Sequence, residues 1–214
     1  MLNKKTLMLA AASLAMATAG AQAEDFRIKQ AGDLVIGFGA IGVLPDSGGS
    51  TSIGGKPHAD DGASPQLDLT YFFTPNIAVN VIAATTRHSL QARNTALGDV
   101  ELGHVWALPP ILTLQYHPLP ESRFSPYLGA GINYTTFYGA GGGTTAPVDK
   151  VAVKNAWGWA LNAGVDYALE GNWALNFDVK KLFLSTDVSL NSGAVTGKVD
   201  LDPWIVGASV RYRF

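Results

Sequence analysis

The stretch KVDLDPWIVGASVRYRF, residues 198–214, decides the fold. From Trp204 onward, every second residue is apolar or aromatic, and the residues between them include small and cationic side chains. A repeat of two residues is typical of a β-strand. A soluble β-sandwich would bury the apolar face under a second sheet, whereas a membrane barrel turns this face to lipid and its small, polar face to the lumen. We interpret the stretch as the closing strand of a barrel, paired with the first strand.

The N-terminus has the pattern of a secretory signal peptide. Lys4 and Lys5 precede an apolar run from Leu7 to Ala19, and Ala21-Gln22-Ala23 forms a cleavage site of the A-x-A type. We predict that residues 1–23 are removed and that residues 24–214 form one barrel domain. The apolar run is too short for a transmembrane helix.

Charge and cysteine content exclude other classes of protein. The formal net charge is −2, which does not favour nucleic-acid binding, and the chain has no cysteine for disulfides or thiol chemistry. We expect no cofactor.

The remainder of the chain alternates between strand patterns and connections of unequal length. We predict an all-β fold, an eight-stranded antiparallel transmembrane barrel of the outer-membrane type, because such barrels have short turns at one end and long loops at the other. The strands are predicted at 33–43, 66–73, 77–88, 111–117, 126–138, 156–168, 173–188 and 198–214. The predicted short connections are 74–76, 118–125 and 170–172, and the predicted longer loops are 44–63, 89–104, 139–154 and 189–195.

Aromatic residues on the apolar faces gather near the strand ends, as in the girdles of membrane barrels. One predicted girdle contains Tyr71, Phe73, Tyr116, Tyr167, Trp173, Tyr212 and Phe214, and the other contains Tyr134, Trp157, Trp159 and Trp204. Lys181 does not fit, because the alternation places it on the lipid face. A bulge or a side chain reaching toward the membrane surface would accommodate it.

Four stretches together resemble the OmpW family of outer-membrane barrels. They are YFFTPNIA at 71–78, LPP at 108–110 with TLQY at 113–116, PYLGAGINY at 126–134, and VDLDPW at 199–204 with YRF at 212–214. The resemblance implies a small monomeric barrel that passes small hydrophobic molecules across the outer membrane of a Gram-negative cell. It supplies no catalytic residues.

The inward-facing residues predict two zones in the lumen. Near the short turns they are polar, and we expect opposite charges among them to pair and plug the barrel: Asp68, Gln115, His117, Asp166, Asp178, Arg211 and Arg213. Toward the other end, Ile41, Val43, Ile82 and Ala84 could line an apolar pocket. The alternative is ordinary filling of a narrow barrel by side chains.

Pro109-Pro110 suggests a weak seam in the barrel wall, close to Trp106 and Leu108. Proline donates no backbone hydrogen bond, so two in succession leave two gaps in a ladder. An apolar molecule could leave sideways through such a seam into lipid. The alternative is that the two prolines simply begin a strand.

Other kinds of site find little support. The four histidines lack metal-ligand spacing, Gly141 to Gly143 lack the lysine of a phosphate loop, and no G-x-S-x-G motif occurs. We expect a channel or carrier rather than an enzyme. Two alternatives remain: a structural or partner-binding barrel, acting as an adhesin or receptor through its loops, and a lipid-modifying enzyme. The expected partners are outer-membrane lipids, small hydrophobic molecules and the barrel-assembly machinery, which would recognise Phe214, and both termini are expected in the periplasm.

Overall fold

The computed structural model describes residues 26–46, 48–51, 56–95, 98–142, 151–190 and 195–214. The predicted signal peptide, residues 1–23, lies outside the described residues. The described residues contain no helix that is long and apolar enough to cross a membrane.

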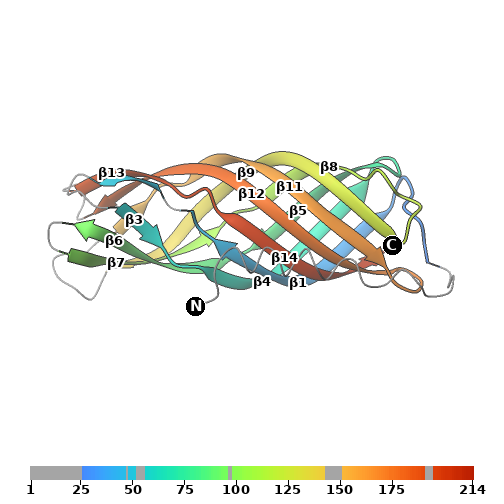
Figure 1. The fold of residues 1–214 in the computed structure, drawn as a ribbon, viewed down its shortest axis with the longest axis horizontal. Coiled ribbons are helices and arrows are strands. Elements are labelled where there is room, and N and C mark those ends of the chain that lie inside the picture. The colour runs from blue at the N-terminus through green and yellow to red at the C-terminus, as the bar shows by residue number, and fades with distance from the viewer. Residues whose placement is uncertain (1–25, 47, 52–55, 96–97, 143–150, 191–194) are drawn as a thin grey trace.

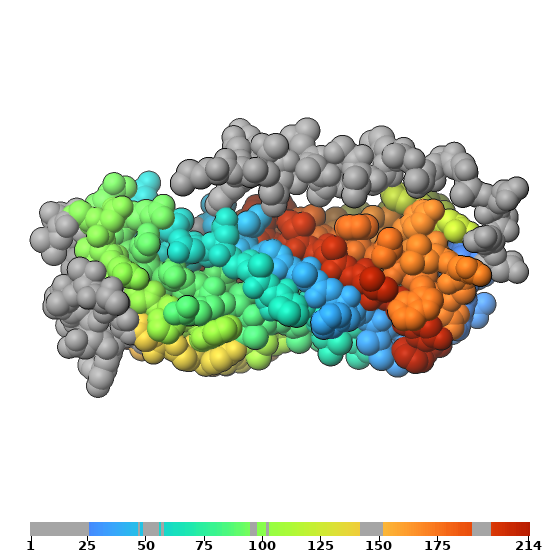
Figure 2. Space-filling model, turned by 90° about the horizontal axis from the view of Figure 1, so that it is seen from below, coloured from blue at the N-terminus to red at the C-terminus, as the bar shows by residue number. Residues whose placement is uncertain are grey.

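Eight antiparallel strands form a closed barrel, which confirms the predicted fold (Figure 1). The last strand pairs with the first from Val35–Arg213 to Leu44–Trp204, as the alternation in the closing stretch predicts. Figure 2 shows these two strands side by side on the outer surface, in red and blue. The eight strands are β1 (Leu34–Leu44), β4 (Gly62–Phe72), β5 (Ile77–Ala84), β8 (Ile111–Tyr116), β9 (Phe124–Gly142), β11 (Ala156–Ala168), β12 (Trp173–Leu190) and β14 (Trp204–Arg213).

Six further strands extend the wall at one end, where the sequence predicts long loops. They are β2 (Gly48–Thr51), β3 (Lys56–Ala59), β6 (Thr86–Thr95), β7 (Gly98–Leu108), β10 (Val151–Val153) and β13 (Val195–Asp200). The predictions of loops at 44–63, 89–104, 139–154 and 189–195 are therefore wrong in part. The predicted strand 77–88 is interrupted at Thr85, and the predicted strand 198–214 is interrupted between β13 and β14.

Most residues of the extension strands escaped prediction, because these strands lack a continuous apolar face. Here we call their end of the barrel the extension end and the opposite end the turn end. The outward side chains of β6 are polar, and the small apolar core of the hairpin of β6 and β7 is formed only when other strands contribute. That core packs Leu90, Val100, Val153 and Val188 around Ala92. Sequence periodicity detects an apolar face on one strand, not a core assembled from several.

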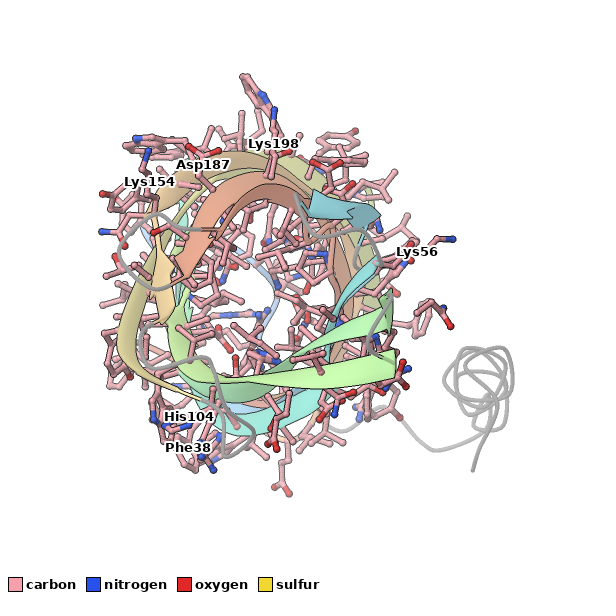
Figure 3. The ribbon with its side chains drawn as sticks, turned by 90° about the vertical axis from the view of Figure 1, so that its left-hand side faces the viewer. Phe38, Lys56, His104, Lys154, Asp187 and Lys198 are labelled. Atoms are coloured by element: carbon pink, nitrogen blue, oxygen red, sulfur yellow. The ribbon has the colours of Figure 1, made fainter. Side chains whose placement is uncertain are left out.

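The lipid-facing surface follows the predicted alternation. Phe38 is 66% exposed and points away from the barrel (Figure 3). Its neighbours on the other face of β1 turn inward. At the turn end, the Trp173 ring lies 4.8 Å from that of Tyr212, which lies 4.8 Å from that of Phe214. These contacts join parts of the predicted girdle across two neighbouring strands.

Lys181 is accommodated without a bulge. Its register with Leu161 and with Trp204 is regular. The ammonium nitrogen lies 5.1 Å from the centre of the Trp204 ring and donates a hydrogen bond to the carbonyl oxygen of Asp202. The long side chain thus reaches along the outer surface to polar groups at the strand end.

Candidate functional site

A buried ion-pair cluster occupies the lumen near the turn end. The Arg211 guanidinium contacts two carboxylates: Nε lies 3.1 Å from Asp68 Oδ1, and Nη1 lies 2.9 Å from Asp166 Oδ1. The Ser209 hydroxyl donates a further hydrogen bond of 3.1 Å to Asp68 Oδ2. Buried charges are tolerated when they are paired in this way. The structure thus brings together three of the residues that the sequence suggested for the polar plug.

Lys29 completes this cluster from an unexpected direction. It belongs to the N-terminal strap, which we define as residues 26–33, ahead of the first barrel strand. The Lys29 ammonium lies 2.8 Å from Asp166 Oδ2, 2.7 Å from Ser125 Oγ and 2.7 Å from His117 Nδ1. The residue is only 3% exposed. A side chain from outside the barrel wall thus enters the lumen and contacts two of the predicted plug residues.

Backbone hydrogen bonds attach the strap across the mouth of the barrel. The Arg27 amide donates to the Gly171 carbonyl (3.2 Å), the Lys29 amide to that of Pro120 (3.1 Å) and the Gly32 amide to that of Phe72 (2.8 Å). Two of these acceptors belong to connections at the turn end, and the third, Phe72, is the last residue of β4. The strap therefore crosses the opening and is attached at several points around it.

Burial and neighbouring charge act together on Lys29 and His117, which lie outside the membrane-spanning strands. Burial lowers the pKa of Lys29 despite the nearby Asp166 carboxylate. Burial, followed by the Lys29 charge, lowers the pKa of His117 to about 3. His117 is therefore neutral at pH 7, and its Nδ1 accepts a hydrogen bond from the Lys29 ammonium.

The three other predicted plug residues, Gln115, Asp178 and Arg213, have different partners. Arg213 Nε lies 3.5 Å from Asp33 Oδ2, a carboxylate of the strap. Asp178 forms a buried ion pair with Lys180 on the same strand. The Asn162 amide links Asp178 Oδ2 (3.2 Å) to Gln115 Nε2 (2.7 Å). The polar zone thus continues from the strap toward the middle of the lumen.

An apolar cluster fills the lumen beyond the polar zone. Ile41, Val43, Ile82 and Ala84, the residues suggested for the apolar pocket, all belong to it, and each is at most 9% exposed. The cluster also includes Ile111, Ala160, Leu182 and Ile205. The two zones meet at Gly207, where an added Cβ would lie 2.7 Å from Asp178 Oδ1 and 3.4 Å from Ile41 Cγ2.

The two prolines lie at an interruption of the barrel wall beside this cluster. Pairing between β5 and β8 stops at Ile82–Ile111, and pairing between β6 and β7 resumes at Thr86–Ala107 with the same offset. Residues 83–85 therefore face residues 108–110 without ladder pairing, and we call this interruption the seam. On its other side the wall is continuous, because the Tyr134 amide donates to the Pro110 carbonyl (3.3 Å) and Leu108 pairs with Thr136. Leu108 lies at the edge of the seam and Trp106 lies beside it, and each is 36% exposed on the outer face.

The arrangement of a charged zone, an apolar cluster and a proline-interrupted wall can be compared with known proteins. The sequence profile of the OmpW family matches residues 30–214. The chain belongs to the OmpW family. Relatives include outer-membrane protein y4mB of Sinorhizobium fredii, 43% identical over 81% of this chain and 76% of the relative. Outer membrane protein W of Escherichia coli is 36% identical over 86% of this chain and 90% of its own length.

Solved structures agree with the OmpW family assignment. The crystal structure of outer membrane protein OprG from Pseudomonas aeruginosa matches with a TM-score of 0.82 at 29% identity, covering 89% of this chain and 99% of that one. A more distant relative, 27% identical over 75% of this chain and 76% of its own length, is the dibenzothiophene metabolism operon protein PahQ of Pseudomonas aeruginosa. The names of y4mB, outer membrane protein W and OprG all place these relatives in the outer membrane.

Sequence reasoning missed several contributors to the lumen of this OmpW-family barrel, among them Ile111, Leu182 and Lys29. Ile111 and Leu182 were detectable, because the alternation in their strands turns both inward. Lys29 carried no periodic signal, since it precedes the first strand. The described residues include no group of three or more His, Cys, Asp or Glu side chains that could hold a metal ion.

Proposed function

We propose that the protein is a passive outer-membrane carrier that admits small hydrophobic molecules from the extension end and releases them sideways into lipid at the seam. The observation that carries the proposal is the position of the apolar cluster. Ile82 and Ile111 form the last ladder pair before the seam, and Ala84 lies within the seam. Apolar side chains thus lead directly to an unpaired part of the wall.

The turn end offers a poor route for an apolar solute. Such a molecule would have to displace paired charges and a strap that is hydrogen-bonded to two connections and to the end of β4. A cavity of about 10 Å³ lies among Lys29, Asp166 and Arg211, which is close to the minimum that holds a single water molecule. Separating buried ion pairs costs several kcal/mol, so exit through this zone is disfavoured.

The seam offers a less costly route. A ladder hydrogen bond contributes about 0.5–1.5 kcal/mol, and the interruption lacks this contribution over three residues of each strand. The two prolines cannot supply the missing donors. Parting the wall here breaks fewer ladder hydrogen bonds than parting it between two fully paired barrel strands, and the parted edges would face the hydrocarbon that an apolar solute prefers.

The name of one relative supports the substrate class. PahQ is named for an operon of dibenzothiophene metabolism, and dibenzothiophene is a small, apolar aromatic compound. We extend this class of substrate to the present protein. We also propose that residues 1–23 are cleaved, that the turn end and both termini face the periplasm, that the barrel works as a monomer, and that Phe214 is recognised during assembly.

The test is the double replacement Pro109→Val and Pro110→Val, which restores two backbone donors opposite residues 83–85. Uptake of a hydrophobic fluorescent probe by vesicles that contain the barrel should fall toward that of barrel-free vesicles. Pro118→Val, in a turn-end connection away from the seam, is the matched control and should leave uptake unchanged. Ion conductance of the purified barrel in planar bilayers is measured in parallel.

Unchanged uptake in the double variant would mean that the prolines only separate two strands. Ion conductance in the unaltered protein without any probe uptake would instead indicate a narrow aqueous pore.

A further inference from the structure

A tyrosine side chain crosses the outside of the seam. Tyr138 lies on β9, and its ring stacks on that of Trp106 at a centroid distance of 6.3 Å and an interplanar angle of 17°. Its hydroxyl lies 2.5 Å from Thr85 Oγ1, at hydrogen-bonding distance. The two hydroxyls thus join residues that are far apart in the sequence.

The strand order shows that this hydrogen bond connects the two sides of the seam. β9 pairs with β7 and β8, which form one side of the seam, whereas Thr85 lies between β5 and β6 on the other side. Tyr138 therefore reaches from beyond the first side, over the outer face of β7, to the opposite side. The bond ties the two sides together where the ladder is interrupted.

Gly139 leaves space for the Trp106 ring to pack closely against the backbone of β9. Its φ is +60°, a left-handed conformation that glycine adopts without strain, and an added Cβ would lie 3.0 Å from Trp106 Cδ1. The ring and the tyrosine that covers it are thus both positioned by the local backbone.

We propose that the Tyr138–Thr85 hydrogen bond, supported by the Trp106 ring, is a latch that sets how often the seam opens. This inference rests on the proposed lateral route and adds the residues that regulate it. The hydrogen bond on the outer face compensates for the backbone hydrogen bonds that the two prolines cannot donate across the seam. A single hydrogen bond is suited to this task, because its modest net strength allows opening at ambient temperature.

Trp106 and Tyr138 could instead be ordinary aromatic residues of the membrane interface. The two interpretations make different predictions for the hydroxyl groups. An interfacial ring keeps its place when Tyr138 is replaced by Phe, whereas a latch fails. Tyr134 provides the matched control, because it lies on the same strand and the same outer face, and its hydroxyl contacts Asn155 rather than the seam.

The first test measures opening directly, without a transported molecule. The chain has no cysteine, so Ala84→Cys introduces a single thiol at an inward-facing position of the seam. Its reaction with a lipid-soluble maleimide in vesicles reports exposure of the seam to the membrane. Ala78→Cys, inward-facing on the same strand but distant from the seam, should react slowly in every background.

Tyr138→Phe and Thr85→Val should each speed labelling of Ala84→Cys by about two- to tenfold, the range for loss of one hydrogen bond. The double replacement should be no faster than either single one, because both remove the same bond. Tyr134→Phe should have no effect. Equal labelling rates with and without the Tyr138 hydroxyl would overturn the latch.

Probe uptake separates the latch from the proposed function. If the proline variant lowers uptake but Tyr138→Phe changes neither labelling nor uptake, the seam is the route and the latch is wrong. If Tyr138→Phe speeds labelling while uptake is unaffected by every seam variant, the latch is supported and the proposed lateral route fails.

Discussion

The two halves of the lumen differ in how their contents are held. In the half nearest the turn end, the Arg211 guanidinium joins Asp68 and Asp166, and Lys29 adds a charge from the strap. In the half beyond it, aliphatic side chains pack against one another, and buried polar pairs such as Thr86–His88 and Asn133–Thr135 lie beside them. The charged half depends on specific distances and angles between ion-pair partners, whereas the apolar half depends mainly on side chains that fill the available space.

This difference supports the proposed opening at the seam rather than at the turn end. Separating the charged half would expose buried ions, whose partners cannot be replaced by lipid. The apolar half adjoins the seam, and its side chains meet a similar environment in the hydrocarbon outside. A narrow barrel can thus be closed at one end and adaptable at the other, although both halves are filled with side chains.

The largest effect is expected when the ion pairs of the charged half are disrupted. Arg211→Met leaves Asp68 and Asp166 without their shared partner and should lower the free energy of unfolding by about 3–5 kcal/mol. Urea unfolding in lipid vesicles provides the measurement. The control is Lys154→Met, which removes an exposed ion pair with Asp187 at the extension end and should cost less than about 1 kcal/mol (Figure 3). Similar losses in both variants would contradict the distinction between buried and exposed pairs.

A somewhat smaller effect is expected in the apolar half. Ile111→Ala removes a fully buried side chain from the cluster and should lower the free energy of unfolding by about 2–5 kcal/mol. The neighbouring lipid-facing residue provides the control: Leu112→Ala should cost less, because lipid can fill the space that it leaves. The same unfolding assay applies to both. Equal costs would show that the cluster is not a packed core.

The smallest effect concerns pH and the strap. The pKa of His117 falls from 6.5 in the unfolded chain to about 3 in the fold, where Lys29, Asp166, Arg211 and Arg213 face it. The unfolded chain therefore binds a proton that the native protein does not, and stability should decrease as the pH falls from about 6.5 toward 3. Above pH 7 this contribution is fully present.

His117→Gln should remove this part of the pH dependence. The unfolding midpoints of the variant and the unaltered protein should change in parallel between pH 7 and 8, and the variant should lose less stability on going to pH 4.5. A parallel loss at low pH would assign the dependence to other groups, such as the carboxylates of the plug.

Much of the barrel could be predicted from alternation alone. In β14, Val210 and Tyr212 face outward and Arg211 and Arg213 inward, as the sequence indicates. Alternation is a local property of one strand, so it can be recognised in the sequence without knowing which strands pair. The extension strands had no such signal, because their apolar residues form a face only after several strands meet.

The sequence by itself determined which side chains face the lumen, because the two-residue repeat fixes this choice along each strand. It also identified the proline pair, because the covalent structure of proline leaves no backbone N–H to donate. Only the tertiary structure decided which inward charges meet. Arg213 pairs with the strap rather than with Asp178, and Asp178 pairs with Lys180. Strand tilt and stagger bring side chains of different strands to one level of the barrel, and the entry of Lys29 depends on a segment without periodicity. The Tyr138–Thr85 bond likewise exists only because the closed ring places β9 near the end of β5.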